Sequence, residues 1–248
     1  GSRGLGDVYK RQLEISEPVE PITWWLENTT PDAYREAITQ GVLAWNEAFE
    51  QAGFKNAIVV KNQPLDATWN AGDVRYNVIR WTSSPNPPFG GYGPSFSNPR
   101  TGQILSADIM LEDIYVSNRV RSDSIFIPDE PANTSIYQRG LSAKHCLASF
   151  NIARGNALGR VTNAVTGNET AASQMVQESL YELALHEVGH TLGLNHNMRG
   201  SQLIDNDKIH DATQTKGVIS SSVMDYSAVN LAPPGLEQGD FYTTRPGP

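Results

Sequence analysis

The chain has 248 residues, of which 39% are hydrophobic and 19% charged, and its formal net charge is −8. A chain of this length can bury a substantial core, and its composition is that of a globular protein rather than a disordered or fibrous one. The negative charge argues against a nucleic-acid partner, which needs clustered Lys and Arg, and no apolar run reaches the ~20 residues of a membrane span.

A single cysteine, Cys146, excludes an internal disulfide. Without a pro-segment pattern around it, we expect an inert buried thiol, although a thiol can in principle block a zinc ion. Residues 1–14 carry no signal-peptide pattern and are interpreted as a lead-in segment that starts with a cloning remnant. We expect a single domain over residues 15–248, with a monomer as the default oligomeric state.

The first elements predicted along the chain are a strand and a long helix. Residues 21–28 (PITWWLEN) are typical of a strand, and Thr30 is predicted to cap the following helix with Pro31 at its first position. Apolar residues then recur at spacings of three and four up to a closing glycine, Gly53, which predicts an amphipathic helix with one buried face. The residues of this stripe are Tyr34, Ile38, Val42, Trp45 and Phe49.

Further strands are predicted at residues 57–61, 74–81 and 104–112. Glycines and Pro94 interrupt residues 91–98 (GYGPSFSN), so this segment is predicted to be an edge strand or a loop. Strands that follow a long helix without regular alternation indicate a sheet with helices packed on it.

Residues 113–168 are harder to interpret and are predicted to be an inserted subdomain or a long loop, with a helix around residues 141–153. A strong helical pattern begins again at about Glu169 and leads directly into His186. Beyond His196 the chain is rich in Ser, Asn, Asp and Gly, which predicts irregular structure.

The stretch HEVGHTLGLNH carries three of the five histidines of the chain together with a glutamate. His186 and His190 are four residues apart, so on a helix they share one face and can bind one zinc ion. Glu187 is then placed to contact a water on the metal rather than the metal itself. Gly193 can take a positive φ and end the helix, which lets His196 turn back as a third ligand. Three histidine ligands leave one position open, as in catalytic zinc sites, whereas the alternative is a set of histidines that only cap a helix.

These residues match the pattern H-E-x-x-H-x-x-G-x-x-H in full, so the chain resembles the metzincin metalloproteases. That family has a downstream Met-turn, and residues 220–227 (SSSVMDYS) are similar to it, which implies that Met224 forms a hydrophobic floor beneath the metal. Tyr226 matches the tyrosine of the astacin-like and serralysin-like members, which approaches the zinc and steadies the transition state. Within the superfamily, the two segments look most like the large bacterial met-zincin proteins.

The resemblance implies a metzincin catalytic domain of the α+β class, with a mixed twisted sheet, one antiparallel edge strand, a long N-terminal helix and a zinc-binding helix. It divides the domain into an upper subdomain, residues 15–196 with the insertion at 113–168, and a lower subdomain, residues 197–248. Metzincins continue into a C-terminal helix, but the chain stops 24 residues after Met224 without one. We therefore expect a truncated lower subdomain.

By the same analogy, the edge strand is the upper rim of the cleft, along which an extended substrate pairs; the alternative is an ordinary surface loop. The expected rim residues are Gly91, Tyr92, Gly93, Ser95 and Phe96. A specificity pocket is expected between the zinc helix and residues 227–233. Val229 and Leu231 would make this pocket apolar and favour a hydrophobic side chain just after the cleaved bond, unless they face the core.

The implied reaction is hydrolysis of a protein or peptide by a zinc endopeptidase. Bound zinc acidifies a water and polarises the scissile carbonyl, Glu187 acts as general base, and Tyr226 donates to the oxyanion. One alternative is a catalytically silent, metzincin-shaped binding module, although such a module has no need of Glu187. The other is an aminopeptidase, which requires an acidic pocket for the free amine of its substrate.

One zinc ion is the expected cofactor. Residues 205–211 (DNDKIHD) hint at calcium, but they have neither the glycine nor the terminal glutamate of a known calcium loop. The resemblance also implies a secreted, periplasmic or cell-surface protein of bacterial origin.

Overall fold

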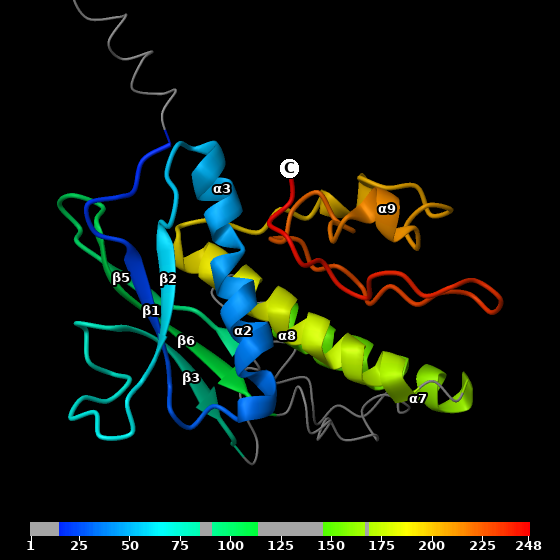
Figure 1. Ribbon diagram of the computed structural model, residues 1–248, viewed down its shortest axis with the longest axis horizontal. Coiled ribbons are helices and arrows are strands. Elements are labelled where there is room, and N and C mark those ends of the chain that lie inside the picture. Colours follow the sequence, from blue (N-terminus) through cyan, green and yellow to red (C-terminus); the bar gives the residue numbers. More distant parts are fainter. Residues whose placement is uncertain (1–14, 85–90, 114–145, 167–168) are drawn as a thin grey trace, which may run out of the picture.

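The computed structural model describes residues 15–84, 91–113, 146–166 and 169–248 of the chain (Figure 1). A mixed sheet forms one part of the molecule, two N-terminal helices lie against it, and a pair of long helices extends away from it. This arrangement confirms the predicted mixed sheet with helices packed on it. In chain order the elements are β1 (Ile22–Leu26), α2 (Asp32–Leu43), α3 (Trp45–Gln51), β2 (Ile58–Asn62), β3 (Asn77–Thr82), β4 (Gly91–Tyr92), β5 (Ser95–Ser97), β6 (Ile104–Glu112), α7 (Ala148–Thr166), α8 (Glu169–Thr191), η2 (Gly200–Gln202) and α9 (Ala212–Thr215).

Four strands of the sheet run parallel in the order β2-β1-β3-β6. The segment at residues 91–98 contributes β4 and β5, which are both antiparallel to β6. Gly93 and Pro94 separate these two short strands, since proline has no backbone N–H to donate to a ladder. Among the described residues, β4 and β5 pair with β6 alone, so the prediction of an antiparallel edge strand is confirmed.

The strand β6 has the predicted bounds, but β3 begins at Asn77 rather than at residue 74. The residues before it form a turn, in which the Tyr76 N–H donates to the Asp73 carbonyl at 3.0 Å. The guanidinium of Arg75 folds back onto the Asp73 carboxylate in the same turn. A local side-chain contact therefore replaces the strand where the β-rich pattern alone predicted one.

The predicted N-terminal helix forms as α2 and α3, which are separated at Ala44. The prediction of Thr30 as its cap is wrong. Pro31 adopts an extended conformation and occupies the N-cap position, so the helix begins at Asp32, one residue later than expected. The Thr30 hydroxyl is buried and makes no hydrogen bond in the described part of the chain.

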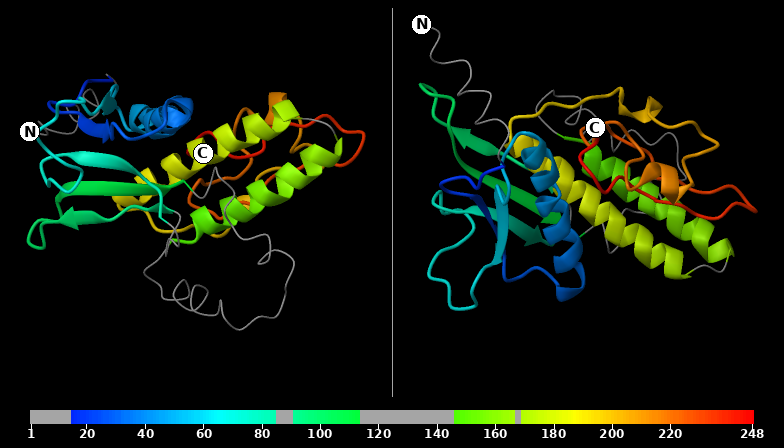
Figure 2. Two further views of the ribbon diagram at one scale, coloured as in Figure 1. Left: turned by 90° about the horizontal axis from the view of Figure 1, so that it is seen from below. Right: turned by 45° about the horizontal axis from the view of Figure 1, so that its top comes forward.

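The two long helices α7 and α8 pack side by side in antiparallel directions (Figure 2). The Asn156 amide of α7 donates to the Ser179 hydroxyl of α8 at 2.8 Å, and Gly159 lies against Met175 with no room for a Cβ atom. The expected short helix at residues 141–153 is thus corrected to a longer one that ends at Thr166. The sequence of α7 has no strong amphipathic pattern, and small residues and tertiary contacts hold this helix in place. Residues 114–145 of the expected insertion lie outside the described residues.

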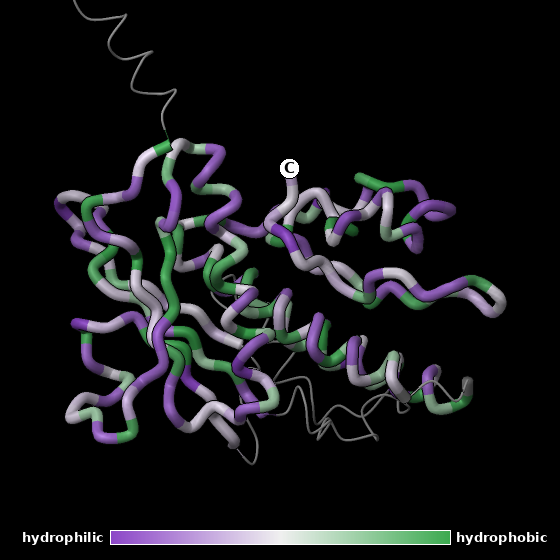
Figure 3. Tube along the Cα trace, in the orientation of Figure 1, coloured by the Kyte–Doolittle hydropathy of each residue, from purple (hydrophilic) through white to green (hydrophobic). Residues whose placement is uncertain are grey.

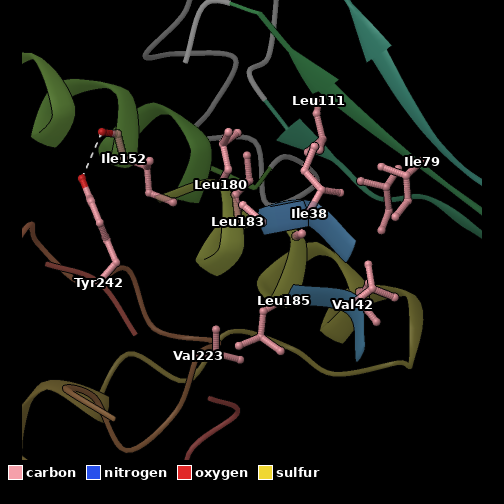
Figure 4. Packing of buried hydrophobic residues seen from close by; sticks show 14 of the residues in the cluster. Ile38, Val42, Ile79, Leu111, Ile152, Leu180, Leu183, Leu185, Val223 and Tyr242 are labelled. Carbon is pink, nitrogen blue, oxygen red and sulfur yellow. Dashed lines mark hydrogen bonds between the residues drawn. The ribbon is translucent and has the colours of Figure 1, made fainter. Parts of the chain in front are cut away.

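Side chains from the sheet, α2 and α8 meet in one hydrophobic core (Figure 4). Each fully buried aliphatic side chain of this size stabilises the fold by about 1.5–3 kcal/mol. The labelled members from these elements are Ile38, Val42, Ile79, Leu111, Leu180, Leu183 and Leu185. Figure 3 shows the matching pattern along the chain, with hydrophobic stretches in the strands and hydrophilic residues in the peripheral loops.

Residues 197–248 have little regular structure, as predicted, but their last part belongs to the core. Phe241 and Tyr242 are fully buried, and their backbone N–H groups donate to the Glu178 carboxylate of α8 at 2.7 and 3.2 Å. The Tyr242 hydroxyl donates to Asn156 of α7 at 3.1 Å and lies 3.4 Å from the Ile152 carbonyl (Figure 4). Among the described residues, no helix combines the length and the apolar character needed to cross a membrane.

Candidate metal centre

The first two histidines of the motif lie on one face of α8, close to its C-terminal end. Their ring centroids are 4.8 Å apart, as expected for residues separated by one helical turn. Gly193 has a φ of +92°, a conformation that other residues rarely adopt, and it lies two residues after the last residue of α8. The chain therefore turns back at Gly193 as predicted, and this turn places His196 beside His190.

Two of the imidazole rings are held in orientation by backbone carbonyls. Nδ1 of His186 donates to the Val223 carbonyl at 2.6 Å, and Nδ1 of His190 donates to the Leu194 carbonyl at 3.0 Å. With the proton on Nδ1, each ring keeps a lone pair on Nε2. Metal-binding histidines in proteins are fixed by second hydrogen bonds of this kind.

The Nε2 atoms face a common point. Nε2 of His196 lies 3.0 Å from Nε2 of His190 and 2.9 Å from the Tyr226 hydroxyl. That hydroxyl also accepts the Leu147 backbone N–H at 2.8 Å, which fixes the tyrosine at the edge of the cluster. The nitrogens are as close as ligands of one tetrahedral zinc ion, which lie roughly 3.3 Å apart at normal Zn–N distances. The donor set therefore fits a zinc ion.

Burial keeps these histidines unprotonated. Desolvation, reinforced by the neighbouring His190, lowers the pKa of His186 to about 3. Desolvation also lowers the pKa of His190 and His196, which remain partly accessible. A histidine must be neutral to bind a metal, so the cluster is ready for an ion at neutral pH without losing protons.

Cys146, which we expected to be an inert buried thiol, belongs to the same cluster. Its sulfur lies 3.3 Å from Nε2 of His186, and all four ligand atoms of the cysteine and the three histidines lie within 4.8 Å of one another. The side chain is only partly buried, and desolvation together with the charge of Glu187 raises the pKa of the thiol. Cys146 is far from the histidines in the sequence and is not part of a metal-binding motif, so the sequence alone did not predict this contact.

Glu187 is fully buried beside the histidines, and desolvation raises the pKa of its carboxyl to about 7. Neither carboxylate oxygen has a hydrogen-bond partner of normal geometry among the described residues. The edge strand covers this carboxylate: a Cβ atom at Gly91 would come within 3.1 Å of Oε1, and one at Gly93 within 3.2 Å of Oε2. The glycines that interrupt the edge strand therefore let its backbone approach Glu187 closely.

Met224 is buried and packs against α8 at Gly189, next to His190. A Cβ atom at Gly189 would collide with the Met224 sulfur and approach the Trp45 ring to 2.9 Å. The indole N–H of Trp45 donates to the Leu185 carbonyl at 2.8 Å, which ties α3 to the same turn of α8. The missing side chain at Gly189 thus allows the Met-turn and α3 to pack directly beneath the histidines.

Other predicted site residues lie away from the histidines or have other partners. Val229 and Leu231 are partly buried and pack against the core next to Gly155 and Gly159 of α7, so the expected specificity pocket stays a prediction. Of the expected rim, Ser95 and Phe96 are exposed on β5 and Tyr92 is partly buried on β4.

In the segment considered for calcium, two of the three aspartate carboxylates contact protein groups. Asp205 pairs with Lys208 at 3.1 Å. Asp211 caps α9 by accepting the Thr213 backbone N–H at 2.9 Å, as an N-terminal aspartate commonly does.

Comparison with known proteins gives one match. Neither a curated protein nor a solved structure matches the chain. A family described as Met-zincin matches residues 168–248, which contain the histidines of α8, the turn at Gly193 and the Met-turn. Over these residues the chain is similar to the Met-zincin family, in agreement with the resemblance that its motifs indicated.

Proposed function

We propose that the chain is a zinc-dependent endopeptidase, with His186, His190 and His196 as metal ligands and Glu187 as general base. The single observation that carries this proposal is the convergence of three neutral imidazole rings, two of them oriented by backbone carbonyls. The Met-zincin match over residues 168–248 supports a peptidase rather than another zinc enzyme.

Zinc bound there would act as a Lewis acid toward the scissile carbonyl and lower the pKa of the attacking water. Glu187 takes the proton of that water and passes it to the leaving amine. Its pKa of about 7 suits this exchange, because a general base works best when its pKa is close to the operating pH. Tyr226 is held at the cluster by Leu147 and donates its hydroxyl hydrogen to the oxyanion.

An extended peptide would pair with the edge formed by β4 and β5. The backbone at Gly91 and Gly93 passes directly over Glu187, so a peptide added to this edge would run past the general base. Tyr92, Ser95 and Phe96 would then line the path of the substrate. The resemblance to metzincins further supports a secreted, periplasmic or cell-surface location and a bacterial origin.

The test combines metal analysis with cleavage of an unbiased peptide mixture, in which each peptide is present with a free and with a blocked N-terminus. We expect one zinc ion per chain, cleavage within blocked peptides, and loss of cleavage after chelation. Cleavage restricted to free N-termini would indicate the aminopeptidase instead. A zinc-loaded chain that binds peptides without cutting them would indicate the binding module.

The matched variants are Glu187→Ala and the isosteric Glu187→Gln. Both should retain one zinc ion per chain, because Glu187 is not a ligand, and both should lose about 10²–10⁴-fold in turnover. Full activity in either zinc-loaded variant would contradict the assignment of the base.

A further inference from the structure

Cys146 lies at the place where a fourth metal ligand would be. At normal Zn–S and Zn–N distances, a sulfur and a nitrogen on one tetrahedral ion lie roughly 3.5 Å apart. The Cys146 sulfur and Nε2 of His186 are 3.3 Å apart, and the sulfur is within 4.8 Å of the ligand nitrogens of the other two histidines. The thiol therefore has ligand geometry toward the same ion as the histidines.

The sulfur faces two hydrogen-bond donors, which would stabilise a thiolate bound to an ion. It accepts the Ala148 backbone N–H at 3.4 Å, at the start of the 19-residue helix α7, where the helix dipole stabilises negative charge. The Tyr226 hydroxyl lies 3.6 Å from the sulfur. When Nε2 of His196 binds a metal, it no longer accepts a hydrogen bond from Tyr226. The Tyr226 hydroxyl can then donate its hydrogen to the sulfur instead.

A second, independent observation concerns Glu187. This carboxylate is fully buried and has no hydrogen-bond partner of normal geometry among the described residues. It also adjoins Cys146 closely enough for its charge to act on the thiol. A buried carboxylate without a partner is unfavourable unless a polar group binds it, so this side of the cluster is expected to take a polar ligand.

We propose that Cys146 is a fourth protein ligand, which closes the zinc centre at rest and must leave before a substrate can bind. This inference rests on the proposed zinc site. On coordination, the S–H bond breaks as the sulfur–metal bond forms, and the proton goes to solvent; on release, the sulfur takes up a proton again. No oxidant or reductant is needed. The chain thereby inhibits its own centre with a residue of its catalytic domain.

Cobalt(II) gives a test that does not depend on activity. It replaces zinc in tetrahedral sites and shows a sulfur-to-metal charge-transfer band only with a thiolate ligand. We expect this band in the 248-residue chain and in Tyr226→Phe, and its loss in Cys146→Ser and Cys146→Ala. The visible bands of tetrahedral cobalt should persist in all four proteins.

The outcomes separate this inference from the proposed function. Failure of the wild-type chain to bind cobalt or zinc stoichiometrically would remove the metal centre and both proposals with it. Stoichiometric binding without the charge-transfer band would overturn the role of Cys146 alone and leave the zinc site intact. A band that survives in Cys146→Ser would overturn it equally, since the chain has no other cysteine.

Two further measurements check the consequence for the resting centre. The Cys146 thiol should react slowly with a thiol reagent in the zinc-loaded chain and quickly after chelation. Cys146→Ser should bind zinc about 10–100-fold more weakly than wild type, yet cleave peptides faster when saturated with zinc. Unchanged thiol reactivity or unchanged zinc affinity would contradict the proposal, whether or not the variants differ in stability.

Discussion

At the residue scale, Tyr226 connects three parts of the site. Its hydroxyl accepts the Leu147 N–H and lies within hydrogen-bonding distance of Nε2 of His196 and of the Cys146 sulfur. It is therefore held by the segment before α7 and by the residues that follow α8. Burial, together with the charge of Cys146, raises the pKa of Tyr226, so the hydroxyl keeps its proton at neutral pH and can donate it.

Tyr226→Phe tests this donor. Turnover of the zinc-loaded chain should fall by about 10²–10³-fold, the usual cost of losing one oxyanion donor, with zinc stoichiometry unchanged. The free energy of unfolding of the metal-free chain should drop by about 0.5–1.5 kcal/mol, because the partly buried Leu147 N–H loses its acceptor. Peptide kinetics and denaturant unfolding measure the two effects, and wild-type turnover would contradict the role of the hydroxyl.

At the scale of elements, the position of α8, which carries His186 and His190, depends on its close approach to α2. A Cβ atom at Gly41 of α2 would overlap the Tyr181 carbonyl oxygen and lie 3.1 Å from the Ala184 side chain. The backbone of α8 is rigid, so neither helix can yield without moving the histidines that lie one to two turns further along. Because Gly41 has no side chain, α2 can pack closely against α8, and this packing helps to fix the position of the histidines.

The variant Gly41→Ala tests this contact through the sign of the change in the free energy of unfolding. In an open helix interior the change stabilises by about 1 kcal/mol, whereas here the overlap should lower the free energy of unfolding by about 1–3 kcal/mol. Chemical denaturation of the variant should be compared with that of Gln40→Ala, the exposed neighbour, which should stay within about 0.5 kcal/mol of wild type. A stabilised Gly41→Ala would show that the helices are not in close contact.

At the scale of the whole molecule, buried carboxylates of α8 anchor the C-terminal segment against this helix. Glu178 binds the Phe241 and Tyr242 backbone N–H groups, and Glu182, one turn further along, is fully buried. Desolvation raises the pKa of Glu182 to about 8. On the surface, Arg245 forms an ion pair with Glu47 of α3, but this half-exposed pair adds at most about 1 kcal/mol.

Glu182 should make the stability of the metal-free chain depend on pH. Its pKa rises from 4.5 in the unfolded chain to about 8 in the fold, so between these values the folded state binds the extra proton. Stability then falls as pH rises, by up to about 1.4 kcal/mol per pH unit. Unfolding of the chelated chain from pH 5 to 8 should show this slope in wild type and in the exposed Glu36→Gln control. In Glu182→Gln the fall in stability should become less steep by up to about 1.4 kcal/mol per pH unit, while Glu187, whose pKa is also raised, keeps its own contribution. An equal slope in that variant would contradict the assignment.

The three histidines could be predicted from the sequence because they lie within eleven residues, where helical periodicity and one glycine determine their geometry. The edge strand could be predicted for a similar reason, because the glycines and Pro94 within residues 91–98 interrupt a regular strand pattern locally. Thr30 and β3 were placed wrongly by one and three residues, because a proline and a turn at Asp73 override the local pattern at element ends.

The sequence by itself therefore predicted the elements of the mixed sheet and brought the three histidines and Glu187, the proposed ligands and general base, into one short segment, since both follow from short-range patterns. Only the tertiary structure decided that Cys146, the Val223 carbonyl and the backbone at Gly91 and Gly93 join the same site. Cys146 lies two residues before α7, and it reaches His186 because α7 packs along α8 in the antiparallel direction. Contacts between residues 37 to 96 positions apart depend on how helices and strands pack, and no local periodicity encodes that packing.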